Sequence, residues 1–128
     1  MTNLKIKSGT SAINVPNGTR GSTDQAMTAV TVSNNSVYFG PLTKGTAIHV
    51  GGEGVNHQVT NNKIQYDGTS NFNCIKISLA LTAYDNVDFN VCSYENTTLG
   101  NWEANTGDLA AWKGTGFGTN SQYAVPGL

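Results

Sequence analysis

Hydrophobic and polar residues alternate most regularly between Asn71 and Tyr94, in two runs joined by a polar segment. Successive side chains of a strand point to opposite faces, so each run has one fully apolar face. The segment between the runs, Ala83–Asn86, contains Asp and Asn, which favour turns. The pattern therefore predicts a central hairpin. Its apolar faces consist of Ile75, Ile77, Leu79 and Leu81 in the first run and of Val87, Phe89 and Val91 in the second.

The second face of the first run is unusually poor in charge, because Lys76 is its one charged residue among small or apolar neighbours. A face in contact with water would normally carry more Lys, Glu and Thr. We therefore infer that this strand is covered on both sides, and in so short a chain another subunit could supply the second cover. The alternative is that small polar side chains face solvent or lie under a loop of the same chain.

The rest of the chain also alternates in short runs, separated by turn residues about every ten positions. Asn61 and Asn62 read as the tight turn of a second hairpin, and Asp108–Trp112 as a single helical turn. Eight to ten short strands at this spacing predict an all-β fold, an antiparallel β-sandwich or jelly roll. Outside the central hairpin, the expected strands are Leu4–Lys7, Ala12–Pro16, Ala26–Ser33, Val37–Pro41, Ala47–Val50, Val55–Val59, Lys63–Tyr66, Asn101–Ala104 and Ser121–Val125.

Composition supports the all-β prediction. Asn and Thr account for 16 residues each among 128, with 15 Gly in addition, and this mixture favours strands and turns over helices. A chain of this length is expected to form one domain, residues 1–128. The terminal segments 1–20 and 114–128 are candidates for attachment or strand exchange with a neighbour.

The net charge of the chain argues against two classes of partner. Seven Lys and Arg against eight Asp and Glu leave a net charge of -1, without any run of like charge. Nucleic acid and anionic membranes attract proteins with a positive field, so neither is an expected partner. The first ten residues contain no hydrophobic run typical of a signal peptide, which favours synthesis and folding in a cytoplasm.

The two cysteines, Cys74 and Cys92, lie on the two strands of the expected hairpin. If those strands pair directly, the thiols are near each other and a disulfide is the alternative. A reducing compartment favours free thiols, and free cysteines are often simply buried, so we expect two buried free thiols.

Candidate catalytic chemistry is sparse. His49, His57 and Glu53 are the nearest approach to a metal-ligand set, but they lack ligand spacing. The chain has no Gly-x-Ser-x-Gly sequence, and its carboxylates fall in turns or on exposed strand positions. We therefore expect a protein that is not an enzyme and has no metal site and no cofactor.

The segments 66–82 and 86–98 resemble the middle of the C1q/TNF-like jelly rolls of tailed-phage virion proteins. The likeness rests on an approach through Tyr66-Asp-Gly, an alternating strand, an Asn-rich turn and a second strand. Ser93–Thr97 stands at the next turn of that pattern, but it lacks the usual Gly. The resemblance implies a homotrimer in the virion of a bacteriophage, made in the bacterial cytoplasm. It would be a capsid decoration or head-fibre protein that binds other virion proteins such as the major capsid protein. It also implies an oligomer interface formed by Phe72, Cys74, Ser78, Ala80 and Tyr94.

An alternative function is a carbohydrate- or receptor-binding domain of a phage tail or fibre, whose partner would be a host surface glycan. Outward-facing aromatic rings can stack on sugars, although aromatic residues more often lie in cores or interfaces. The aromatic candidates for that role are Trp102, Trp112 and Tyr123.

Overall fold

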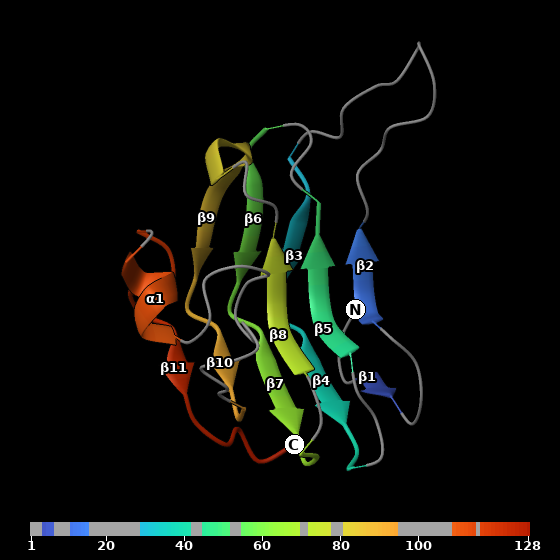
Figure 1. Ribbon diagram of the computed structural model, residues 1–128. Helices are drawn as coiled ribbons and strands as arrows, with labels where there is room; N and C mark the ends of the chain where they lie inside the picture. The colour runs from blue at the N-terminus through green and yellow to red at the C-terminus, as the bar shows by residue number, and fades with distance from the viewer. Residues whose placement is uncertain are drawn as a thin grey trace.

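The computed structural model describes residues 4–6, 11–15, 29–41, 45–51, 55–69, 72–77, 81–94, 109–114 and 116–128. Its strands form three sheets in which every pairing is parallel, with the orders β1-β4-β7-β10-β11, β2-β5-β8 and β3-β6-β9 (Figure 1). The strands are β1 (Leu4–Ile6), β2 (Ser11–Val15), β3 (Thr31–Ser33), β4 (Ser36–Phe39), β5 (Gly45–Val50), β6 (His57–Thr60), β7 (Lys63–Tyr66), β8 (Phe72–Ile77), β9 (Tyr84–Asp88), β10 (Val91–Cys92) and β11 (Gln122–Tyr123). A 3-10 turn (Leu81–Ala83) precedes β9, and the helix α1 (Leu109–Gly114) precedes β11.

The chain visits the three sheets in rotation. After β4 in the five-stranded sheet come β5 in the second sheet and β6 in the third, and β7 then returns to the first sheet beside β4. Each circuit is one coil, and equivalent positions of successive coils are 27 or 28 residues apart, as for Asn35, Asn62 and Asn90. This winding is a parallel β-helix, in which each coil packs against its neighbours.

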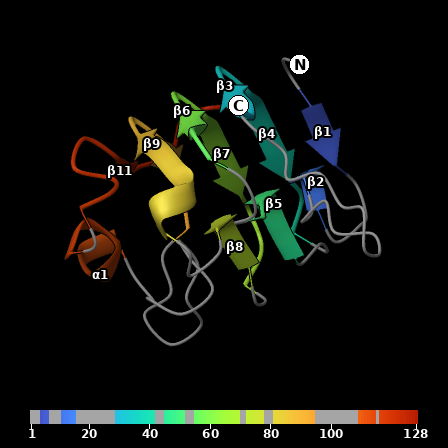
Figure 2. The same ribbon diagram turned by 90° about the horizontal axis from the view of Figure 1, so that it is seen from above.

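The three sheets enclose one apolar interior (Figure 2). Val37 from β4, Ile48 from β5 and Val59 from β6 are all fully buried. The register aligns these side chains with like residues of the next coil, so that Ile48 pairs with Ile75. Burying an aliphatic side chain of this size contributes about 1.5–3 kcal/mol, and the aligned rows repeat that contribution from coil to coil.

A buried asparagine ladder runs along one corner of the β-helix. Asn35, Asn62 and Asn90 occupy the same position in successive coils, between the sheet that contains β3 and the sheet that contains β4. Asn62 Nδ2 donates to Asn90 Oδ1 at 3.0 Å, and the Asn90 main-chain N–H donates to Ser121 Oγ at 3.0 Å. The ladder satisfies main-chain groups that the corner would otherwise leave buried without partners.

The all-β expectation is confirmed, but the antiparallel sandwich or jelly roll is wrong, because every sheet is parallel. The expected central hairpin is also wrong: β8 pairs with β5, and β9 pairs with β6 in another sheet. Asn61 and Asn62 likewise bend the chain from one sheet into the next instead of reversing it. Turn residues suit a bend as well as a reversal, so the alternation and the turns that carried the jelly-roll resemblance also arise in parallel coils.

The buried residues of strand β8 are covered by its own chain. Phe72, Cys74, Ile75 and Ile77 are all buried, so the regular alternation is interrupted where Cys74 and Ile75 follow each other into the interior. Phe72 stacks on Tyr66 with ring centroids 4.2 Å apart. No second subunit is needed to account for the low charge of this strand.

The expectation of free thiols is wrong, because Cys74 on β8 and Cys92 on β10 form a disulfide, with Cα atoms 6.2 Å apart. Both cysteines are fully buried. They come from different sheets and meet across the interior, whereas the sequence reasoning placed them side by side on paired strands. The disulfide ties two coils of the solenoid together.

The helical turn expected at Asp108–Trp112 corresponds to α1. The strand expected at Asn101–Ala104 lies outside the described residues. In the part of the chain that the structure describes, no helix is long and apolar enough to cross a membrane.

Candidate functional site

One corner of the β-helix carries a row of exposed residues in left-handed backbone conformation. Asn34, Asn61 and Phe89 have φ values of 58°, 57° and 56°, and each directly precedes a member of the asparagine ladder. All three are exposed. Because neighbouring strands of a sheet are about 4.8 Å apart, equivalent residues of successive coils form a ridge at roughly that spacing. We call Asn34, Asn61 and Phe89 the corner ridge.

Phe89 is the exceptional member of the corner ridge. Asn tolerates the left-handed region because its short side chain bonds the local backbone, whereas a bulky residue there is strained by about 1–2 kcal/mol. The Phe89 side chain is 51% exposed, so burial of the ring offsets only part of that cost. Strain retained at an exposed aromatic residue points to a role outside folding.

Asp88 ties the backbone of Phe89 to Asn120. Its Oδ1 accepts hydrogen bonds from the main-chain N–H of Phe89 at 2.8 Å and of Asn120 at 2.7 Å, and its Oδ2 accepts one from Asn120 Nδ2 at 2.8 Å. Burial raises the pKa of the Asp88 carboxyl, but the hydrogen bonds from Asn120, Phe89 and Ser121 outweigh it and hold the pKa below its ordinary value. A stably charged Asp88 therefore joins the Phe89 corner to the next coil.

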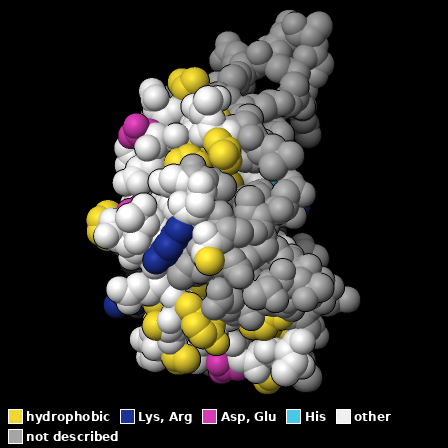
Figure 3. Space-filling view, turned by 60° about the vertical axis from the view of Figure 1, so that its left-hand side comes forward, with side chains coloured by type: hydrophobic (Ala, Val, Ile, Leu, Met, Phe, Trp, Pro, Cys, Tyr) yellow, Lys and Arg dark blue, Asp and Glu magenta, His cyan; other side chains and the backbone are white. Residues whose placement is uncertain are grey.

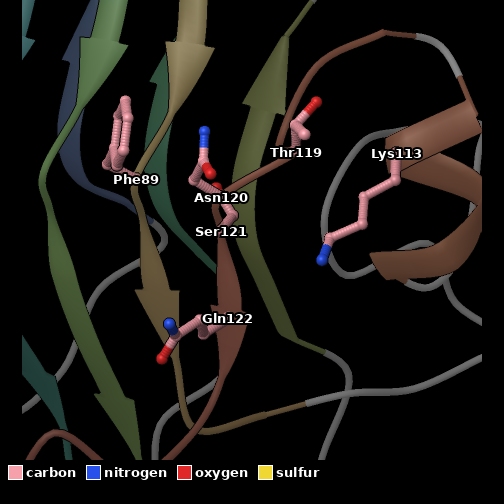
Figure 4. A pocket seen from close by; sticks show the side chains of 6 residues that line it. All are labelled: Phe89, Lys113, Thr119, Asn120, Ser121 and Gln122. Carbon is pink, nitrogen blue, oxygen red and sulfur yellow. The ribbon is translucent and has the colours of Figure 1, made fainter.

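A groove of about 420 Å³ lies beside Phe89 (Figure 4). Figure 4 shows the Phe89 ring on one side and Lys113, from α1, on the other, with residues of the segment before β11 between them. The space-filling view of this side of the molecule shows a basic side chain near the middle of the face, with the most visible acidic side chains above and below it (Figure 3). The groove is lined by Phe89, Lys113, Thr119, Asn120, Ser121 and Gln122.

The lining combines one apolar ring face with amides, hydroxyls and an ammonium group. Asn120 donates its amide to Asp88, which leaves its amide oxygen available as an acceptor, while Thr119 and Gln122 are exposed. Asp88, the carboxylate behind this lining, has both oxygens engaged. Among the described residues, no three His, Cys, Asp or Glu side chains are grouped to hold a metal ion. The groove is suited to binding a polar ligand that has some apolar surface.

Of the five residues expected at an oligomer interface, the structure describes three, and none of these three is exposed. Phe72 and Cys74 are 1% and 0% exposed, so the folded chain leaves them almost no surface to offer a partner. Tyr94 is half-buried and packs edge-on against Tyr66 and Phe72, with centroids 5.1 and 5.8 Å away. The remaining two residues, Ser78 and Ala80, lie outside the described residues.

Of the three residues expected to bind glycans, Tyr123 is the one whose side chain the structure describes. It is 55% exposed on β11 and follows Gln122, which lines the groove, but Tyr123 itself is not in the lining. Trp112 belongs to α1, and only its place in the helix is described. Trp102 lies outside the described residues.

Sequence reasoning assigned Phe89 to the apolar face of a strand and missed its role at the corner. The available signal was a repeat in which a buried Val is followed two positions later by a left-handed residue and then by Asn. This repeat occurs at Val32–Asn35, Val59–Asn62 and Val87–Asn90, at spacings of 27 and 28 residues. Aligning the three copies identifies Phe89 as the departure from Asn.

Comparison with family models, curated proteins and solved structures found no match to the chain.

Proposed function

We propose that this protein is a non-catalytic recognition module that binds carbohydrate at the groove beside Phe89, as the receptor-binding domain of a phage tail or fibre. The observation that carries the proposal is the half-exposed Phe89 ring, held in a strained left-handed conformation where the neighbouring coils have Asn. Exposed rings of this kind stack on the apolar face of a sugar.

The groups around the ring match the other requirement of sugar binding, which is directional hydrogen bonding to hydroxyls. Thr119, Asn120 and Gln122 offer a hydroxyl and two amides beside the ring. Amides and hydroxyls both donate and accept, as sugar hydroxyls do. These groups lie on a rigid scaffold, because Asp88 fastens the Phe89 corner to Asn120.

The proposal that the site is non-catalytic rests on its titratable groups. Lys113 and Asp88 are the ionisable side chains that line or directly support the groove in the described part of the chain. The Asp88 carboxylate accepts four hydrogen bonds, from Phe89, Asn120 and Ser121. It is therefore poorly placed to abstract or deliver a proton. Hydrolysis of a glycosidic bond normally needs two working carboxyl groups.

A glycan array followed by titration of the best hits tests the proposal. Wild-type protein should bind a defined set of glycans, and Phe89→Ala should weaken that binding at least about fivefold, as expected from losing about 1 kcal/mol of ring stacking. Tyr123→Ala is the matched control, since Tyr123 is a similarly exposed aromatic residue outside the groove lining. Absence of glycan binding by the wild type, or an equal loss in both variants, would count against the Phe89 site.

A trimeric capsid decoration or head-fibre protein is the second candidate function. The structural feature that favours it is the pair of outer strands of the five-stranded sheet, β1 and β11, each of which has one edge without a neighbouring strand among the described residues. Such edges can accept a strand from another protein. Light scattering should then give three times the chain mass of 13.5 kDa, and a monomer at micromolar concentration would argue against this role.

A further inference from the structure

We propose that the Phe89 groove selects saccharides that carry an anionic group, and that Lys113 is the residue that recognises it. This inference rests on the proposed carbohydrate-binding function and adds the ligand's charge class. Its basis is the position of Lys113 at the side of the groove opposite the Phe89 ring (Figure 4). A ligand that stacks on Phe89 and spans the groove would bring its far substituents to the Lys113 ammonium.

The Lys113 side chain extends from α1 into the lining of the groove, and the residue is exposed. It belongs to the last turn of a six-residue helix, so its ammonium is presented by a segment distinct from the strand coils that hold Phe89 and Asn120. The groove is therefore formed between two structural units, one with the cation and one with the aromatic ring and the amides.

Among the described residues, Asp88 is the charge beside the groove that could oppose an anionic ligand, but it is buried and is not part of the lining. Both of its oxygens accept hydrogen bonds from Asn120, and one also accepts the main-chain N–H of Phe89. Because these donors engage both of its oxygens, the carboxylate stays behind the lining, whereas Lys113 is part of the lining. In the described part of the chain, Lys113 is the one cation that lines the groove, and its ammonium favours a carboxylate or a sulfate ester on the sugar.

The polar groups between Phe89 and Lys113 favour a saccharide over a small anion. Thr119, Asn120 and Gln122 can bond ligand hydroxyls, and the groove volume of about 420 Å³ is far larger than a single carboxylate or sulfate requires. A simple inorganic anion would use only Lys113 and leave the ring and the amides without contacts. The combination fits a sugar residue with an acidic substituent.

The test compares three probes by calorimetric titration at low and at physiological ionic strength. They are an oligouronate, the neutral oligosaccharide obtained by reducing its carboxyl groups, and a sulfated oligosaccharide of the same length. The wild type should bind the acidic probes about two- to fivefold more tightly than the neutral one, the range expected for an exposed charge pair, and salt should reduce the difference. A preference for the oligouronate or the sulfated probe would identify the anionic group.

Two variants separate the inference from the proposed function. Lys113→Gln should bring the affinity for the acidic probes down to that for the neutral probe. The control is Lys76→Gln, on β8, which belongs to a different sheet from β11. This variant should leave all three affinities unchanged. Equal affinity of wild-type protein for acidic and neutral probes, with no effect of Lys113→Gln, overturns the inference and leaves carbohydrate binding intact. Failure of all three probes to bind overturns the inference and counts against the proposed function as well.

Discussion

Asn62 Oδ1 accepts two hydrogen bonds from Asn35, one from its main-chain N–H at 3.1 Å and one from its side-chain Nδ2 at 3.0 Å. The two residues are equivalent positions of successive coils, and Asn90 serves Asn62 in the same way. The amides therefore hold neighbouring coils in register at the corner of the β-helix, where all three asparagines are buried. The ladder leads to the first prediction.

Asn62→Ala should lower the free energy of unfolding by about 2–4 kcal/mol. In this variant the buried main-chain N–H and side-chain amide of Asn35 lose their acceptor, and Asn90 Oδ1 loses a donor. Urea denaturation followed by circular dichroism measures the loss. Asn61→Gly is the matched control at the adjacent exposed position, where glycine also adopts the left-handed conformation. It should change stability by no more than about 0.5 kcal/mol. Equal losses in the two variants would show that the ladder is not a special source of stability.

Phe89→Asn should be more stable than Phe89→Ala by about 0.5–1 kcal/mol. Both variants remove the ring, but Asn tolerates the left-handed backbone of the corner ridge better than Ala does. Thermal unfolding of the pair measures the difference without needing a ligand. Equal melting temperatures would indicate that the backbone at residue 89 relaxes once the ring is gone, and would remove the argument from strain.

Reduction of the Cys74–Cys92 disulfide should lower the free energy of unfolding by about 3 kcal/mol. The bond closes a segment of 18 residues, and opening it returns loop entropy to the unfolded chain. Urea unfolding with and without a strong reductant measures the change. The double variant Cys74→Ala/Cys92→Ala should show the same stability in both conditions. If the free energy of unfolding of the wild type is also the same with and without reductant, the disulfide adds nothing to stability.

Stability should fall in acid partly because of Asp88. Its folded-state pKa lies below the unfolded value of about 3.9, so the unfolded chain takes up the proton first. The contribution of Asp88 is therefore fully present above about pH 4 and is lost as the pH falls through the folded-state pKa. Unfolding free energies measured from pH 2 to pH 7 should decline less steeply at the acid end in Asp88→Asn than in the wild type. Parallel curves for the two proteins would show that Asp88 does not supply this dependence.

The strand content was predictable from the sequence, but the pairing of the strands was not. The alternation around Ile75 and Val87 correctly indicated extended chain at both places, and Asn61–Asn62 correctly indicated a change of direction. Whether the chain reverses at such a turn or merely bends into another sheet depends on partners 27 residues away. Local alternation and turn propensity have no information about those partners.

The candidate site shows the same division. The sequence pointed to Trp102, Trp112 and Tyr123 as aromatic residues in polar surroundings, whereas Phe89 is the aromatic ring that lines the groove among the described side chains. In the sequence Phe89 continues an alternating hydrophobic run, and only its left-handed backbone at the corner turns its side chain out of the core. Lys113 and Asn120, which line the groove together with Phe89, lie more than twenty residues later in the chain. Folding alone brings the three residues to one place.

The sequence by itself determined the all-β character of this protein, because residue alternation and abundant Asn, Thr and Gly act through local backbone preferences. The tertiary structure decided that the strands are parallel, that Cys74 meets Cys92, and that Phe89 faces a groove with Lys113. These outcomes depend on how successive coils stack. Stacking is governed by contacts between residues far apart along the chain, whose combined burial and hydrogen bonding outweigh the local preferences of any one segment.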